Sequence, residues 1–246
     1  LARPEFVDYW TYKWSDMLLI SSKNLPVPQE LNAFYRYVRE AVEENRPWDQ
    51  FVRGIITASG NTQQNGAANY FFMHREIPDL AETTSQAFLG TSITCARCHN
   101  HPLEKWTQNQ YYGFANLFSR VRVKNGKTAG NDIVAASFGD VLHPLSGKAI
   151  PPQPLDGVVA EDAPGADRRA ALADWLTAPE NPYFTRAIVN RVWKNFMGRG
   201  LVEPVDDLRL TNPATNEPLM ASLCLDLSEQ GYDLKALMRS ILTSAA

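Results

Sequence analysis

The sequence predicts a mainly α-helical fold, on two observations. Apolar residues recur at spacings of three and four over long stretches in both halves of the chain, as on the buried face of a helix. Residues 121–160 depart from that period, with alternating Val121-Arg-Val-Lys, the turn dipeptide Asn125-Gly126 and then many Gly and Pro residues. We therefore expect a helical part over 1–120, an extended, hairpin-containing connecting segment over 121–160, and a C-terminal helical domain over 161–246.

The N-terminal part is expected to hold four helices. Asn45-Arg46-Pro47 separates the second from the third, because proline suits a first helical turn and disfavours continuation of the preceding helix. A stretch rich in Gly, Asn, Gln and Thr, residues 59–69, is expected to be a loop. Gly90 is placed to end the fourth helix. The four expected ranges are 4–21, 30–44, 48–58 and 80–89.

The C-terminal part is also expected to hold four helices. Asn181-Pro182 supplies an N-cap and a first-turn proline, and Gly198 and Gly231 stand where C-terminal glycines are expected. The second of these helices has a wide apolar face, which predicts a central position in the core. The expected ranges are 168–178, 182–198, 218–230 and 234–244.

Composition narrows the class of protein. The chain has 246 residues, a net charge of −3, 44% hydrophobic and 21% charged residues, which are ordinary values for a globular protein. Its apolar runs, such as Met17-Leu18-Leu19-Ile20, are far shorter than the ~20 residues of a membrane-spanning helix, so we expect no membrane span. Basic residues form no stripe, so we expect no nucleic-acid partner. Because the chain begins at Leu1, we interpret it as a mature product or an excised fragment.

One motif carries chemistry: Cys95-Ala96-Arg97-Cys98-His99, which has the C-x-x-C-H form of a c-type haem attachment site. Two cysteines three residues apart on one helical turn point the same way, so both sulfurs can form thioethers to one porphyrin. The next residue then places an imidazole under the iron. The motif predicts covalent haem c, with Cys95 and Cys98 as anchors and His99 as the proximal iron ligand.

Three other interpretations of the cysteines are open. In a zinc site, Cys95 and Cys98 would combine with His99 or His101 and one further histidine. In a thiol-redox site, the pair would start a helix after a βαβ strand, whereas a helix and a short loop are expected here. In a structural interpretation, the pair is a disulfide or two inert buried thiols beside a solvated histidine.

A haem iron whose sixth position is filled by the protein suits electron transfer, whereas an open position allows the iron to bind an external ligand. His101 lies too close to His99 in sequence to reach the opposite face of the porphyrin easily, so a contact to the haem edge suits it better. His143 lies in an extended segment, where a histidine is often only solvated. From the residues alone, the sixth iron ligand could therefore be His143, His74 or Met73, or the sixth position could be open.

Side chains around the motif suit contacts to a flat macrocycle. Trp106 and Tyr111 belong to an aromatic and polar run that could pack against the ring and hydrogen-bond to its edge, or could belong to an ordinary amphipathic helix. Arg97 and Lys105 could neutralise haem propionates or lie solvated at the surface. We name Arg97, Trp106 and Tyr111 as haem contacts beside the motif itself.

At these residues the chain resembles a known domain pair. Its motif region resembles the planctomycete cytochrome C domain, and its C-terminal half resembles the planctomycete-associated domain of unknown function that usually accompanies it. His143-Pro with Ser146-Gly147 is similar to the His-Pro-x-Thr-Gly stretch of that family, which favours His143 as the distal ligand over His74. The other matching stretches are Phe88-Leu-Gly, Cys95-Ala-Arg-Cys-His-Asn-His-Pro, Trp106-Thr-Gln, Tyr111-Tyr-Gly, Asn181-Pro-Tyr-Phe, Asn190-Arg-Val-Trp, Gly198-Arg-Gly-Leu-Val, Pro204-Val-Asp-Asp and Asp233-Leu-Lys.

The resemblance implies export to the periplasm, the cell surface or the exterior, and supplies no activity. Residues 1–120 then form a haem-c-binding domain whose expected role is electron transfer with a redox partner protein or other haem-bearing chains. Whether the chain is an enzyme stays open. The alternatives are a haem-dependent oxidoreductase, with carbohydrate as one substrate class, and an assembly module stapled by haem or zinc. In the assembly module, segment 121–160 would reach further chains or domains of a longer precursor.

Overall fold

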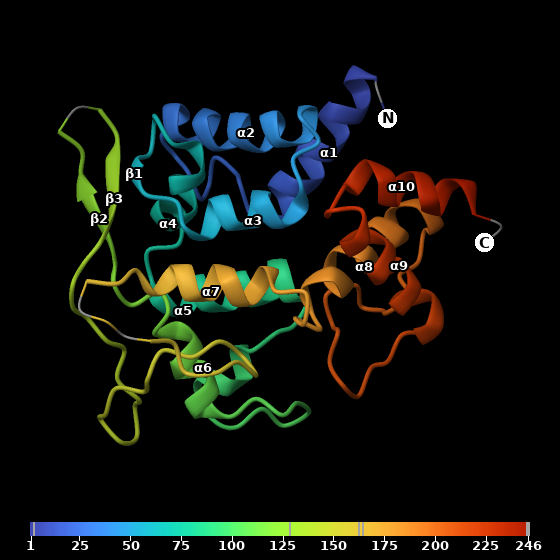
Figure 1. Ribbon diagram of the computed structural model, residues 1–246. Helices are drawn as coiled ribbons and strands as arrows, with labels where there is room; N and C mark the ends of the chain where they lie inside the picture. The colour runs from blue at the N-terminus through green and yellow to red at the C-terminus, as the bar shows by residue number, and fades with distance from the viewer. Residues whose placement is uncertain (2, 128, 162, 164, 245–246) are drawn as a thin grey trace.

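The computed structural model describes residues 1, 3–127, 129–161, 163 and 165–244, and its fold is mainly α-helical, as predicted (Figure 1). A small antiparallel sheet accompanies the helices. The helices are α1 (Pro4–Met17), α2 (Pro28–Glu43), α3 (Trp48–Ile56), α4 (Asn69–Met73), α5 (Ile77–Thr84), α6 (Gln108–Ala115), α7 (Arg168–Thr177), α8 (Phe184–Met197), α9 (Glu217–Glu229) and α10 (Leu234–Thr243); the strands are β1 (Gly60–Asn61), β2 (Val121–Asn125) and β3 (Asn131–Ala135).

The first helix is shorter than its apolar period predicts. The expected helix 4–21 is wrong in its last turn, because α1 ends at Met17 and Leu19 has φ 60°. This turn buries Leu18 completely and leaves Leu19 47% exposed. Burial of Leu18 and Leu25 therefore overrides the local helical pattern.

The expected loop 59–69 contains ordered structure. β1 pairs with β3, a short 3₁₀ turn covers Gly66–Ala68, and α4 begins at Asn69. A Cβ on Gly66 would lie 2.2 Å from the Ala33 carbonyl oxygen of α2, so this approach requires glycine. The fully buried Asn69 amide donates to the Thr62 and Gly66 carbonyls at 2.7 and 3.0 Å. The loop prediction is wrong here because these polar residues bond to backbone within the protein.

The hairpin predicted at Asn125-Gly126 is confirmed. β2 and β3 pair antiparallel with Val123 opposite Ile133, and β3 lies between β1 and β2. Glu30 of α2, 1% exposed, ties the sheet to the helices by accepting from Thr62 Oγ1 at 3.0 Å and Asn131 Nδ2 at 2.9 Å. The hairpin is thereby fixed to the helical part of its own chain.

The helix expected over 80–89 starts three residues earlier, at Ile77. Pro78 stands in its first turn, and its final turn, Ser85–Leu89, is π-helical. It ends at Gly90, as predicted, where φ is 60° and a Cβ would lie 2.7 Å from Leu208 Cδ1. This turn leads directly into the C-x-x-C-H segment.

The C-terminal helices agree with the sequence pattern to within two residues. The expected start of the second at residue 182 is wrong by two, because α8 begins at Phe184 with Tyr183 as its N-cap, so the predicted N-cap at Asn181 and first-turn position of Pro182 are wrong as well. Asn181 Oδ1 nevertheless accepts from the Tyr183 and Phe184 N–H groups at 2.9 and 3.0 Å just before the helix. Gly198 and Gly231 have φ of 75° and 65° at the ends of α8 and α9, as predicted. Buried Ile188, Val189 and Val192 confirm α8 as a core helix.

One connected cluster of buried apolar side chains joins the early helices to the late ones, running from Trp10 to Ile241. α7 packs on α3, and α8 packs on the Ser85–Leu89 turn. Figure 1 shows α8, α9 and α10 gathered beside α1. The division at residues 120 and 160 stays a prediction. Within the described ranges, no helix is both long enough and apolar enough to cross a membrane.

Candidate functional site

The motif forms a short helical turn whose reactive side chains face outward. Thr94–Arg97 is a 3₁₀ helix, and the N–H groups of Cys98 and His99 both donate to the Cys95 carbonyl at 3.4 Å. Ala96 is fully buried and anchors the turn, whereas Cys95, Cys98 and His99 are exposed. The turn therefore presents two sulfurs and an imidazole to whatever lies outside it.

Both motif cysteines are free and exposed. The interpretation as inert buried thiols is therefore wrong, and the pair forms no disulfide. α5 and the Ser85–Leu89 turn precede the motif, so it lacks the preceding strand of a thiol-redox site. Among the residues that the structure describes, no three Cys, His, Asp or Glu side chains gather as a metal ion would require, so the complete ligand set of a zinc site is not assembled there.

The tautomer of His99 follows from its one hydrogen bond. Its Nδ1 lies 2.7 Å from the carbonyl oxygen of Asn100, and a carbonyl only accepts. Nδ1 therefore carries the proton and donates it, and the lone pair of the neutral ring is on Nε2. A backbone carbonyl on Nδ1 is the usual way to orient a histidine that binds a metal through Nε2.

α6 holds the backbone of the motif in place. Gln108 Nε2 and Tyr112 Oη both donate to the Arg97 carbonyl, at 3.0 and 3.1 Å, and the Gln108 N–H donates to Asn100 Oδ1 at 3.0 Å. A capping box of Thr107 with Gln110 starts the helix. Two of these bonds reach the motif backbone and the third reaches the Asn100 side chain, and none involves the sulfurs.

Glu82 of α5 holds the other side of the turn. Its carboxylate accepts from Tyr111 Oη at 2.8 Å and from Thr94 Oγ1 at 3.1 Å, with Arg97 Nη1 at 3.9 Å. Burial, followed by the bond to Glu82, raises the pKa of Tyr111. Tyr111, which we expected to contact haem, therefore uses its hydroxyl to bond to Glu82. The Arg97 side chain, the other expected contact here, is 48% exposed and has one long ion pair.

Trp106 closes the loop that follows the motif. Its ring is 1% exposed, lies edge-on to Tyr183 at 6.0 Å, and has the Lys105 ammonium 4.9 Å from its centroid. Lys105 is paired with Asp156, to which Tyr183 also donates. Burial, reinforced by Asp156, raises the pKa of Tyr183 to about 12. The backbone N–H of His101 stabilises the same loop by donating to the Trp106 carbonyl at 2.8 Å.

His143 is 8% exposed, so the interpretation as a solvated loop histidine is wrong. Its ring lies 5.4 Å from that of Tyr112, the residue bonded to the motif backbone. Its Nδ1 accepts from the N–H groups of Leu145 and Ser146 at 3.2 and 3.4 Å. Asn116, the residue that follows α6, fixes the segment by donating to the carbonyls of residues 141 and 150.

Tyr112 belongs to the aromatic run that the sequence singled out, but it was not among the chosen haem contacts. It stands next to the chosen Tyr111 in one aromatic run, and only the rotation of α6 decides which ring joins the motif to His143. Burial raises the pKa of Tyr112, and Arg97 opposes that rise. The signal in the sequence was the Tyr-Tyr pair itself.

His74 and Met73, the other ligand candidates, lie at the end of α4. His74 is 8% exposed and packs edge-on against Tyr70 at 5.1 Å, and its Nε2 has no hydrogen-bond partner among the described residues. Burial lowers its pKa to about 4, against the opposing influence of Asp79. In the part of the chain that the structure describes, no hydrogen bond fixes the tautomer of His74, in contrast to that of His99.

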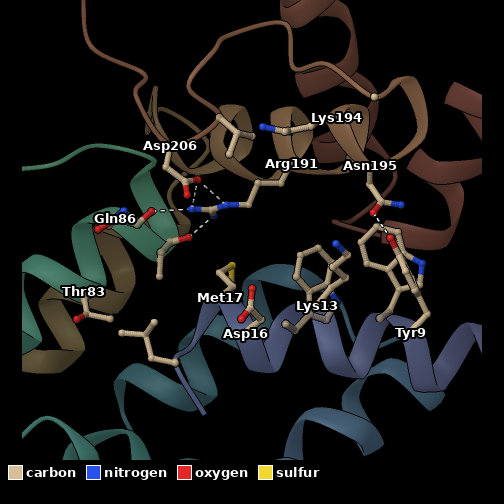
Figure 2. A pocket seen from close by; sticks show the side chains of 16 residues that line it. Tyr9, Lys13, Asp16, Met17, Thr83, Gln86, Arg191, Lys194, Asn195 and Asp206 are labelled. Carbon is tan, nitrogen blue, oxygen red and sulfur yellow. Dashed lines mark hydrogen bonds and ion pairs between the residues drawn. The ribbon is translucent and has the colours of Figure 1, made fainter. Parts of the chain in front are cut away.

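A cavity of about 590 Å³ lies apart from the motif, between α1 and α8 (Figure 2). The two cations that α8 contributes to it are both paired. Arg191 bonds to Asp206 and to the carbonyls of residues 86 and 87, Lys194 pairs with Glu203 at 3.1 Å, and Tyr9 donates to the Asn195 side chain. These contacts hold the helices together.

Comparisons with known proteins give two families and no individual relative. Residues 1–123 match PSCyt2, a protein of unknown function (DUF1549), and residues 168–246 match PSD1, a protein of unknown function (DUF1553). No curated protein and no solved structure matches the chain. The domain pair that the sequence resembles is thereby supported. Because the first match covers residues 1–123 of 246, the chain belongs to the PSCyt2 family of unknown function.

Proposed function

We propose that this chain carries one covalent haem c on Cys95 and Cys98, with His99 as the proximal iron ligand, and that it transfers electrons. One observation carries the proposal: a single turn presents two free, exposed thiols and a histidine whose Nε2 lone pair is available. Each thiol would add across one vinyl group, which needs no leaving group. When bound, the haem supplies a one-electron carrier whose potential the protein sets through ligands, burial and hydrogen bonds.

The surroundings of the motif fit an apolar macrocycle. Three strongly exposed leucines lie in the two loops that carry the motif and His143: Leu103 (58%), Leu142 (55%) and Leu145 (84%). These side chains lie within a few residues of the motif or of His143, so a bound macrocycle would be able to cover them. Arg97, half exposed and only weakly paired, has donors available for a propionate.

His143 is the residue we assign as the second axial ligand. The two N–H groups on its Nδ1 place the neutral ring's proton on Nε2, so iron binding requires that proton to move to Nδ1. At 3.2 and 3.4 Å these contacts are long and weak, and the segment from residue 144 to 149 is exposed, so the loop can release them.

Two axial histidines leave no open iron position, which favours electron transfer over a haem-dependent oxidoreductase acting on carbohydrate or another substrate. The assembly module is the weaker alternative, because segment 121–160 packs on its own chain: β3 pairs with β1, and the Gln153 N–H donates to the Gly113 carbonyl at 3.0 Å. The electron partner would be a redox protein, another haem-bearing chain, or a further domain of a longer precursor. Periplasmic, cell-surface or extracellular location follows from where haem c is attached.

The test is a pyridine haemochrome spectrum of the exported chain after acid-acetone extraction. A c-type band that remains with the chain supports the proposal, and Cys95→Ser with Cys98→Ser removes it. Cys224→Ser, a cysteine on α9 away from the motif turn, is the matched control and keeps the band. Loss of all haem colour on extraction of the unsubstituted chain, with zinc found by elemental analysis, would contradict it.

The sixth ligand is tested by the optical spectrum of the intact protein. His143→Ala should convert low-spin iron to high-spin iron that binds carbon monoxide readily, whereas His74→Gln should leave the spectrum unchanged. An unchanged spectrum in His143→Ala removes His143 from the iron. High-spin iron in the unsubstituted protein would favour the oxidoreductase.

A further inference from the structure

The peptide group between Asn100 and His101 holds the ring of His99 by one end and the loop after the motif by the other. Its carbonyl oxygen accepts from His99 Nδ1 at 2.7 Å, and its N–H donates to the Trp106 carbonyl at 2.8 Å. A peptide group whose N–H is bonded is polarised, so its carbonyl becomes a better acceptor. The bond to Trp106 therefore strengthens the bond that keeps the proton of His99 on Nδ1.

The side chain of Asn100 supplies a second anchor for the same peptide group. Its Oδ1 accepts from the Gln108 N–H at 3.0 Å. Gln108 is the first residue of α6, where backbone N–H groups have no partner within the helix. The bond to Trp106 alone would leave the peptide group free to rotate about that bond. Two anchors fix the direction in which its carbonyl points.

The neighbouring histidine shows how much the carbonyl matters. The Nδ1 of His101 accepts from the Leu103 N–H at 3.2 Å, so the proton of the neutral ring is on Nε2. His143 has the same arrangement, with two N–H groups on its Nδ1. Of these three described histidines, His99 alone has a carbonyl on Nδ1 and therefore a lone pair on Nε2.

We infer that Asn100 is the positioning residue of the proximal ligand: its side chain, held by α6, aims the carbonyl that keeps Nε2 of His99 available to iron. The inference deepens the proposed function and rests on it for the consequence at the metal. A carbonyl on Nδ1 makes the imidazole a stronger electron-pair donor, which favours oxidised iron and lowers the reduction potential. Asn100 acts through His99 and is not itself a ligand.

The bond between Asn100 and Gln108 can be broken from either side. Asn100→Ala removes the acceptor, and Gln108→Pro removes the donor, because proline has no N–H. Proline suits the first position of α6, and the preceding Thr107 is already extended, with φ −89° and ψ 162°. Gln108→Ala is the matched control. It keeps the N–H and removes only the side-chain bond to the Arg97 carbonyl, which Gln108→Pro removes as well.

The first readout is the tautomer of His99 in the full chain before haem attachment, measured from the NMR shifts of its ring nitrogens at alkaline pH. We expect the Nδ1–H form in the unsubstituted chain and in Gln108→Ala. Asn100→Ala and Gln108→Pro should shift the ring toward the Nε2–H form, because its acceptor is no longer held in place. The ring shifts of His74, buried at the end of α4, report that each variant is folded.

A merely structural role of Asn100 would lower stability without changing this tautomer. An Nδ1–H form that persists in folded Asn100→Ala or Gln108→Pro would overturn the inference. So would an equal change in Gln108→Ala, or an Nε2–H form in the unsubstituted chain.

The second readout is the reduction potential of the haem-loaded chain. Asn100→Ala should raise it, and Gln108→Pro should raise it further than Gln108→Ala does, because His99 becomes a weaker donor to oxidised iron. Equal potentials in Asn100→Ala and the unsubstituted chain would overturn the inference. If no haem attaches, the proposed function fails, and the tautomer of the haem-free chain alone decides the role of Asn100.

Discussion

The motif turn at residues 94–99 and the turn after α8 at residues 199–205 both pack irregular backbone on a helix, but they use their side chains differently. In the second turn, Asn190 of α8 donates to the carbonyls of Val202 and Val205 at 2.9 and 3.0 Å and accepts from the Val202 N–H at 3.0 Å. In the motif turn, Gln108 and Tyr112 from α6 bond to the backbone. The motif's own sulfurs take no part.

This difference separates structural from functional polar groups. Asn190 is fully buried, and its side-chain amide donates twice and accepts once within the protein. Cys95 and Cys98 are exposed and free on a turn that other residues hold in shape. A rigid frame around uncommitted side chains is the arrangement expected for binding a partner or cofactor.

The largest expected effect is at the structural turn. Asn190→Ala leaves two carbonyls and one N–H of the buried turn without partners, which should lower the free energy of unfolding by about 3–5 kcal/mol. Denaturant titration measures it. Asn109→Ala, an exposed asparagine of α6, should change stability by less than about 0.5 kcal/mol. Similar values for the two variants would remove the contrast between the turns.

The next effect comes from His74, the buried histidine beside the motif. Its pKa is about 4 in the folded chain and near 6.5 when unfolded, so the unfolded state binds more protons between these values. Stability is therefore full above pH 6.5 and falls as pH drops toward 4, by about 3 kcal/mol from this group. His74→Gln should flatten that part of the stability curve. The same slope in the variant would show that other groups cause it.

A smaller effect is expected in the frame of the motif. Tyr112→Phe removes one hydrogen bond to the Arg97 carbonyl, which keeps its bond from Gln108, so the free energy of unfolding should fall by about 1 kcal/mol. Tyr12→Phe, on a 62% exposed side chain of α1, is the control and should have no measurable effect. If Tyr112→Phe lowered the free energy of unfolding as much as Asn190→Ala, the residues that hold the motif turn would be as important to the fold as the buried core.

The smallest effect on stability is expected at the cysteines themselves. In the haem-free chain, Cys95→Ser with Cys98→Ser should change the free energy of unfolding by less than about 0.5 kcal/mol, because both side chains are exposed and unbonded. Thermal unfolding of the two haem-free proteins compares them directly. A marked loss of stability would show that the thiols help to hold the fold together.

The sequence predicted the helical class, the ends of helices at Gly90, Gly198 and Gly231, and the hairpin at Asn125-Gly126, because these depend on local backbone preferences. It failed at residues 59–69, where Asn69 and Thr62 look like loop residues until their partners are known. Long-range pairing is invisible to a local pattern.

The motif itself was readable from spacing, but its surroundings were not. Tyr112 rather than Tyr111 joins the turn to His143, and this depends on how α6 rotates against α5. The burial of His143 depends on Asn116, which bonds to residues on both sides of that histidine. Neither signal lies within the C-x-x-C-H segment.

The central claim is that the uncommitted side chains of the motif turn hold haem covalently. The most direct measurement is the intact mass of the exported, unfolded chain, followed by sequencing of the peptide that contains residues 95–99. We predict a mass increase of one haem, carried by that peptide and absent when both cysteines are replaced by serine. An unmodified mass for protein that has passed through a haem-attaching export pathway would contradict the account.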